Sequence, residues 1–163
     1  IATATSNNTV AIWDTKSGEL IRRLEGHSQS VQSCIFSQDG NTIASIADDN
    51  TVTLSDIKSG VLIRRLESHS GSVQSCTFSR DNNMIASASM NNTLSLWDAK
   101  TGKKLRTSIL YPNHEYATIN EATKEVLAAS ANTWPYLGYT VYDEKLERLR
   151  YYPAELFGPL PTG

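Results

Sequence analysis

Polar and apolar residues alternate along short runs of this chain, and the alternation recurs at a fixed interval. Thr51–Ser55 reads TVTLS, and the later run Thr93–Trp97 reads TLSLW. Alternation with a period of two is typical of a β-strand with one buried face. Clusters of turn-forming residues, such as Asp39–Asn41 and Lys58–Gly60, separate these runs. The pattern therefore predicts short strands that are joined by tight turns.

The chain also contains an internal sequence repeat. LIRRLEGHSQSVQSCIFSQDGNTIAS begins at Leu20, and LIRRLESHSGSVQSCTFSRDNNMIAS begins at Leu62. A Trp-Asp dipeptide ends at Asp14 and again at Asp98, and a Ser-Asp dipeptide ends at Asp56, halfway between them. The dipeptides therefore recur at the same interval as the longer repeat. A period of about 40 residues is typical of arrays of small sheets. Because one such unit cannot bury its hydrophobic face alone, the units are predicted to stack.

The repeats resemble the WD-repeat family of β-propellers, closely over residues 1–110 and less closely over 111–152. The shared features are (Gly/Ser)-His, Phe-Ser-x-Asp, Ile-Ala-Ser and Asn-Thr-(Val/Leu). The resemblance implies an all-β fold of β-propeller blades, each made of four antiparallel strands named a to d from the axis outward. In one unit, these strands are expected at Val31–Ser37, Thr42–Ala47, Thr51–Asp56 and Val61–Leu66.

A partial array of about four blades is expected from the repeat. Residues 1–25 supply strands b, c and d of a first blade, and residues 26–67 and 68–109 form the second and third blades. Residues 110–152 form a divergent blade in which Tyr142-Asp143 replaces Trp-Asp, and residues 153–163 form a Pro-rich closing tail. Propellers of this family usually have more blades. Closure is therefore expected from upstream blades of a longer chain or from a second copy.

Composition restricts the class of protein and of partner. Hydrophobic residues make up 39% of the chain and charged residues 20%, as in soluble globular proteins. The net charge of −2 argues against nucleic acid, and no apolar run reaches the ~18 residues of a membrane span. Cys34 and Cys76 are predicted to be separate buried thiols, which favours a cytoplasmic location.

The resemblance assigns a structural role to several polar residues of each repeat. In the family, a His, a Ser or Thr, an Asp and the Trp of strand c form a buried hydrogen-bonded network. This network ties the loop between strands d and a to the turn between strands b and c. The corresponding sets are His27, Ser45 and Asp49; His69, Ser87, Asn91 and Trp97; and in part Thr3, Asn7 and Trp13. No set is complete. Asn replaces Asp in the first and third blades, and Ser55 replaces Trp in the second blade.

The same residue types also occur in catalytic sites and metal sites. The first set matches a Ser-His-Asp hydrolase triad, but a catalytic site is not needed in each blade, so no catalytic residue is assigned. The histidines lie on different blades and are not expected to converge on one metal ion. No cofactor is expected either. Two pairs of adjacent arginines, Arg22-Arg23 and Arg64-Arg65, lie on the predicted strands d. They are interpreted as a solvated outer edge, where charges discourage edge pairing, in preference to a docking rim for an acidic partner.

The loops between strands d and a, and between b and c, usually bind partners in this family. The candidate partner-binding residues are Gln29, Asp48, Asn50, Met90, Asn92, Tyr111, Tyr116, Trp134 and Tyr136. The aromatic members are typical interface anchors, and they fit a cover for the end of the array equally well.

The leading functional hypothesis is a non-enzymatic scaffold that recognises a protein or peptide. The alternative is a C-terminal sensor or autoinhibitory propeller of a larger bacterial signalling NTPase or protease. The aromatic and Pro-rich tail resembles the closing segment of such proteins.

Overall fold

The computed structural model describes residues 1–67, 69–130, 133, 138–143 and 148–153. These residues form antiparallel β-sheets and one 3₁₀ helix, Pro112–His114. The predicted all-β class is therefore confirmed. The contacts divide the chain into two compact units, Ile1–Leu105 and Arg106–Gly163, and each is described by itself.

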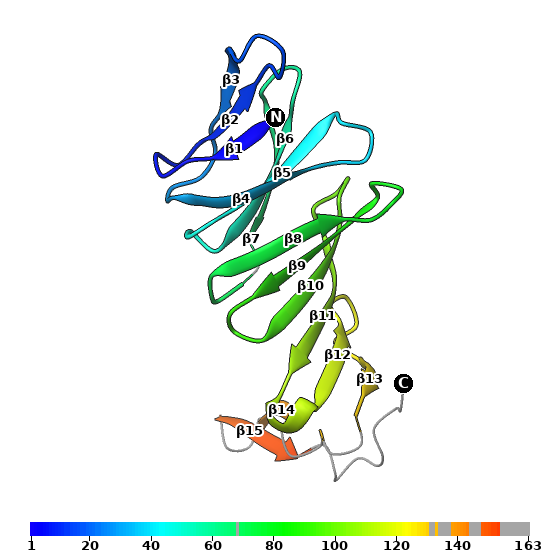
Figure 1. Cartoon of the computed structure of the whole chain (residues 1–163). Coiled ribbons are helices and arrows are strands. Elements are labelled where there is room, and N and C mark those ends of the chain that lie inside the picture. Colours follow the sequence, from blue (N-terminus) through cyan, green and yellow to red (C-terminus); the bar gives the residue numbers. More distant parts are fainter. Residues whose placement is uncertain (68, 131–132, 134–137, 144–147, 154–163) are drawn as a thin grey trace. The chain divides into compact units, whose positions relative to one another are not determined.

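The first unit repeats the order of strands that the sequence predicts (Figure 1). The first blade has β1 (Ala2–Ala4), β2 (Val10–Trp13) and β3 (Leu20–Leu24); the second has β4 (Val31–Phe36), β5 (Thr42–Ala47), β6 (Thr51–Asp56) and β7 (Leu62–Glu67); the third has β8 (Val73–Phe78), β9 (Met84–Ser89) and β10 (Thr93–Asp98). Strands that follow one another within a blade pair antiparallel.

Two strands of the second blade differ in their bounds from the prediction. Strand a ends at Phe36 instead of Ser37, and strand d is displaced by one residue, to Leu62–Glu67. The register between β6 and β7 shifts between Leu54 and Ser55, as at a β-bulge. A bulge inserts a residue without a ladder partner, so strict alternation cannot locate the ends of this strand.

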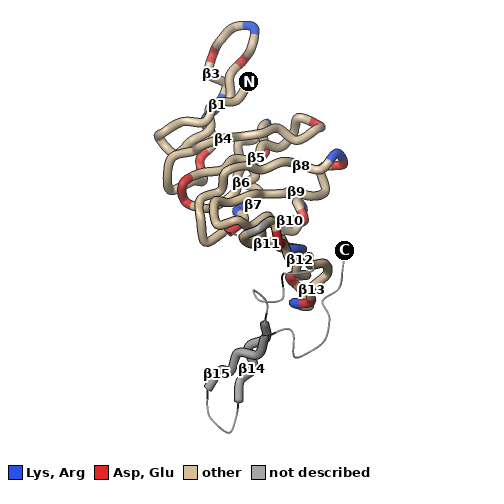
Figure 2. Tube along the Cα trace, turned by 60° about the horizontal axis from the view of Figure 1, so that its bottom comes forward, with Lys and Arg blue, Asp and Glu red and all other residues tan. Residues whose placement is uncertain are grey.

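The turns of the first unit need residues that accept a left-handed backbone. In the b–c turns, Asn8, Asn50 and Asn92 have φ angles of 66°, 62° and 61°. In the c–d turns, Gly18 and Gly60 have φ angles of 73° and 77°. Asn and Gly adopt this region at the lowest cost, which explains why these two residue types recur at the turns. Figure 2 shows acidic positions, in red, in several of the same turns.

Two hydrophobic cores lie between successive blades of the first unit, and β5 contributes to both. Ile43 and Ala47 pack towards the first blade, whereas Ala44 and Ile46 pack towards the third. Successive side chains of a strand point to opposite faces, so both faces of this strand are covered. The predicted stacking of blades is thus the source of the core.

Arginines of strand d connect each blade to the next. Arg22 donates hydrogen bonds to the carbonyls of Lys58 (3.1 Å) and Ser59 (2.9 Å). Arg64 donates to the carbonyl of Lys100 through Nε (3.3 Å) and Nη2 (3.2 Å). Arg23 and Arg64 are exposed, as expected of a solvated edge, but Arg22 and Arg64 also make these contacts to the next blade. Their long side chains reach the c–d turn of the following blade.

The second unit contains the divergent part of the repeat. Its strands are β11 (Lys104–Leu110, which begins in the first unit), β12 (Tyr116–Asn120), β13 (Val126–Ala129), β14 (Gly138–Asp143) and β15 (Arg148–Pro153). β12 pairs with both β11 and β13, and β14 and β15 form a separate two-stranded sheet. The repeat assigns β11 and β12 to different blades, so their pairing departs from the simple array. The boundary at residue 110 stays a prediction.

Candidate functional site

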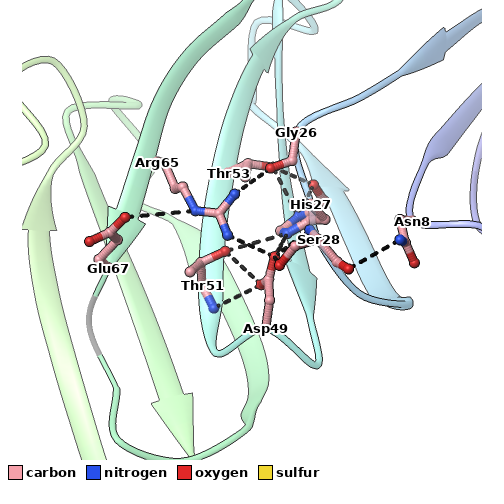
Figure 3. A network of polar contacts seen from close by, with 10 residues as sticks. Asn8, Gly26, His27, Ser28, Asp49, Thr51, Thr53, Arg65 and Glu67 are labelled. Carbon is pink, nitrogen blue, oxygen red and sulfur yellow. Dashed lines mark hydrogen bonds and ion pairs between the residues drawn. The ribbon is translucent and has the colours of Figure 1, made fainter.

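The polar network of the second blade joins two loops to the middle of the sheet (Figure 3). His27 lies in the d–a loop, Ser45 on β5 and Asp49 in the b–c turn. The His27 Nε2 atom lies 3.0 Å from the Ser45 hydroxyl, and its Nδ1 atom lies 3.1 and 3.2 Å from the two Asp49 carboxylate oxygens. The Ser28 backbone amide also donates to Asp49 at 2.9 Å. The structure therefore brings the three expected residues together.

Thr51, Thr53 and Arg65 also belong to this network, and the sequence reasoning missed all three. The Thr53 hydroxyl lies 2.7 Å from the Ser45 hydroxyl and 3.0 Å from His27 Nε2. Arg65 donates to the Asp49 carboxylate at 2.9 Å and also to the Gly26 carbonyl. Ser45 pairs with Thr53, and Thr53 with Arg65, across the three strands. The regular pairing of β5 with β6 was the signal that could have identified Thr53, whereas the bulge between β6 and β7 hides Arg65 from the sequence pattern.

The Asp49 carboxylate is held ionised by the groups around it. Burial by itself raises its pKa, but hydrogen bonds from the Thr51 hydroxyl, the Ser28 amide and His27 outweigh burial. They lower the pKa from 3.8 to about 2. The Asp49 side chain is only 4% exposed. The carboxylate is therefore a fixed, fully bonded anion beneath the loops.

The third blade contains a related but uncharged network. His69 Nε2 lies 2.8 Å from the Ser87 hydroxyl, and Trp97 donates its indole N–H to the same hydroxyl at 2.9 Å. His69 Nδ1 lies 2.9 Å from the Thr93 hydroxyl, which in turn donates to Asn91 at 2.6 Å. All four expected residues are thus connected, with Thr93 between His69 and Asn91.

Burial determines the charge of His69. The side chain is desolvated and lies near the Lys104 ammonium, and both effects lower its pKa from 6.5 to about 4. Lys104 itself lies over the Trp97 ring, 5.0 Å from the ring centroid. His69 is therefore neutral at pH 7 and serves as a hydrogen-bonding bridge.

The first blade keeps only part of the network. Trp13 donates its indole N–H to the Thr3 hydroxyl at 2.9 Å. Asn7 instead accepts hydrogen bonds from the hydroxyls of Thr5 and Thr9 within its own turn. The indole bond thus recurs in the first and third blades, the two repeats that keep a Trp on strand c.

The Ser45, His27 and Asp49 contacts reproduce the order of a hydrolase triad. Ser45 is however only 4% exposed, and its hydroxyl is shared with Thr53. The His27 side chain is 3% exposed. A nucleophile must reach its substrate, so this arrangement acts as an internal brace of the blade.

The expected partner-binding residues differ in their exposure. Gln29, Asp48, Met90 and Asn92 are exposed, Met90 by 70%, while Asn50 is half-buried. In the second unit, Tyr111 and Tyr116 are half-buried, and Tyr111 packs against the small core of that unit. Trp134 and Tyr136 lie outside the described residues.

A polar cleft opens beside the second-blade network on the same loops. It has a volume of about 480 Å³ and is lined by Asp49, Asn50, Thr51, Arg65, Glu67 and His69. Glu67 is the most exposed charge, with 81% of its side chain accessible, and lies 3.9 Å from Arg65. The cleft therefore has two carboxylates and one guanidinium.

In the described part of the chain, no group of three or more His, Cys, Asp or Glu residues could hold a metal ion. Both cysteines are free and half-buried; burial raises the pKa of Cys34, and raises that of Cys76 to about 12. None of the helices in the described ranges is long and apolar enough to cross a membrane.

Comparison with known families assigns the repeats. Residues 18–56 and 60–98 both match the family described as WD domain, G-beta repeat. The second match begins and ends one repeat period after the first, and each ends at the Asp that closes strand c. No curated protein matches the chain significantly. WD repeats generally mediate contacts between proteins and are typically not enzymes. The chain therefore contains two repeats of the WD-repeat family, at residues 18–56 and 60–98.

Proposed function

We propose that this chain is a non-enzymatic scaffold that recognises a protein or peptide through the d–a and b–c loops of its second and third blades. The observation that carries the proposal is the cleft of about 480 Å³ on these loops. Its walls are held by the His27, Asp49 and Arg65 contacts beneath it. A site that is already ordered loses less conformational entropy when a partner binds.

The charges of the cleft favour a basic segment. The Asp49 carboxylate already accepts hydrogen bonds from the Ser28 amide, the Thr51 hydroxyl and one Arg65 nitrogen. Glu67 is 81% exposed and makes only a long contact to Arg65. A Lys or Arg side chain of the partner can therefore pair with Glu67. This ion pair would orient the partner in the cleft.

The proposal is tested by screening the full chain against an array of peptides of varied charge. We expect selective binding of basic peptides, which the Glu67→Lys substitution should abolish without changing the thermal stability, because Glu67 is exposed. Arg80→Glu, in an a–b turn at the other end of the blade, is the matched control and should leave binding intact. Equal binding by the wild-type chain and Glu67→Lys would contradict this site.

Cytoplasmic location, and closure of the propeller by upstream blades or by a second copy, stay proposals of the same kind. They are supported only by the resemblance and by the composition.

A further inference from the structure

A smaller cavity lies between the second and third blades, at the end of the sheets that carries the a–b and c–d turns. Its volume is about 150 Å³. Leu54, Ile63, Phe78 and Ala99 supply its apolar surface; its polar lining consists of Ser37, Asp39, Thr42, Asn82, Asn83 and Lys100. A pocket of this size has room for a benzene-sized ring, and its four apolar residues offer that ring apolar contacts.

Contacts between the blades hold the walls of this cavity in place. The Gln38 backbone amide donates to the Asn82 side-chain oxygen at 2.8 Å, across the two blades. Within the third blade, the Ala99 amide donates to the Asn83 carbonyl at 2.9 Å. Arg64 binds the Lys100 carbonyl from the second blade. The cavity is therefore preformed and does not depend on a mobile loop.

The repeats differ in the size of one side chain at the junction between blades. Ile57 is the counterpart of Ala99 in the preceding repeat, and its amide makes the equivalent hydrogen bond, to the Asn41 carbonyl at 2.9 Å. Ile57 packs against the core between the first and second blades. At the next junction, Ala99 has the same backbone position but lacks the larger aliphatic group. The smaller Ala99 side chain thus leaves more room at this junction than Ile57 leaves at the preceding one.

The charge at the mouth of the cavity selects the partner. The Asp39 carboxylate already accepts hydrogen bonds from the Ser37 hydroxyl and from the Asn41 amide and side chain. The exposed Lys100 ammonium has no ion-pair partner among the described residues. Lys100 adds to the hydrogen bonds from Thr101 in lowering the pKa of Asp98, but it makes no ion pair with that carboxylate. Its ammonium can therefore bind an anionic group of a partner.

We propose that this cavity is a second binding site, which accepts the aromatic side chain of a partner peptide while a neighbouring carboxylate of that peptide pairs with Lys100. The site is separate from the loop cleft, because it lies at the opposite end of the strands and needs the opposite charge. It gives the scaffold two surfaces on one pair of blades.

The test uses a fluorescein-labelled peptide with the sequence Gly-Glu-Phe-Glu-Gly, capped at both ends, and the full chain. Fluorescence anisotropy should show saturable binding to the wild-type chain. Ala99→Ile, which copies the residue at position 57, should weaken binding at least tenfold while the circular dichroism spectrum stays unchanged. Replacing Phe by Ala in the peptide should weaken binding by a similar factor.

Charge variants keep the test decisive even where Ala99→Ile does not fold. Lys100→Glu should weaken binding of the acidic peptide and strengthen binding of the matched peptide with Lys in place of Glu. Lys58→Glu, at the equivalent position of the second blade, is the control and should change neither affinity. Glu67→Lys should also leave this binding intact, which separates the result from the loop cleft.

Two outcomes would overturn the proposal. One is wild-type binding that Ala99→Ile and Lys100→Glu leave unchanged, and the other is the absence of saturable binding by the wild-type chain at millimolar peptide.

Discussion

Arg65 donates a hydrogen bond to the Asp49 carboxylate at 2.9 Å, in the repeat where Ser55 stands in place of the Trp. The next repeat has Asn91 at the position of Asp49 and Thr107 at the position of Arg65, and it keeps its Trp. The ion pair and the missing indole therefore occur in the same blade. Arg65 ties the b–c turn to the Gly26 carbonyl of the d–a loop. In the third blade, the Trp97 and Ser87 contact instead anchors the His69 network.

A double-mutant cycle measures this pair. Arg65→Thr should lower the free energy of unfolding by about 1–3 kcal/mol, because it removes a charged donor from the buried Asp49 carboxylate. Adding Asp49→Asn to Arg65→Thr copies the residues of the third blade and should cost less than the sum of the two single changes. Urea unfolding of the four proteins gives the coupling energy. Arg23→Thr, at an exposed position, is the control and should change stability by less than about 0.5 kcal/mol. Additive losses would show that the pair is not coupled.

The two Trp side chains of strand c should contribute unequally. Trp97 is 3% exposed and packs in the core between the second and third blades, whereas Trp13 is half-buried. Trp97→Ala should cost about 3–5 kcal/mol, as losses of buried Trp side chains do, and Trp13→Ala should cost less. Urea melts of both variants provide the comparison. Equal losses would contradict the difference in packing.

The two network serines should also differ. Ser45→Ala leaves His27 Nε2 next to the Thr53 hydroxyl at 3.0 Å, so the loss should be about 1 kcal/mol. Ser87→Ala removes the partner of both His69 and Trp97 and should cost more. Thermal unfolding of the two variants ranks them. The reverse order would mean that Thr53 does not replace Ser45.

Acid should destabilise the chain in two separate pH windows. Stability rises with pH wherever the unfolded state binds more protons. The pKa of His69 falls from 6.5 to about 4 on folding, so its contribution is complete above pH 6.5 and is lost between pH 6.5 and 4. The pKa of Asp49 falls from 3.8 to about 2, so its contribution is complete above pH 3.8 and is lost between pH 3.8 and 2.

Urea midpoints measured against pH distinguish these two groups. His69→Gln should flatten the profile between pH 6.5 and 4, and Asp49→Asn should flatten it below pH 4. The exposed His114, replaced by Gln, is the control for the upper window. A slope between pH 6.5 and 4 that survives His69→Gln would assign the effect to another group.

The sequence by itself determined the repeat, most strand positions and the turns. These features are local: alternation with period two decides which side chains share a face, and only Asn or Gly fits a left-handed turn at low cost. Strand b, Thr42–Ala47, lies where the pattern predicts it. The grouping of His27, Ser45 and Asp49 is also predictable from the sequence, because the family resemblance supplies it and the internal repeat shows it again.

Only the tertiary structure decided where the long side chains go. Arg22 and Arg64 read as an outer stripe from their sequence neighbours, yet they reach carbonyls about 36 residues away in the next blade. The direction of Arg65 depends on the bulged register of β7 against β6, which no local pattern encodes. The cavity that Ala99 lines lies where two blades pack face to face, with a smaller side chain there than at the preceding junction. Contacts between blades join residues that are far apart in the chain, so they exist only once the sheets have stacked.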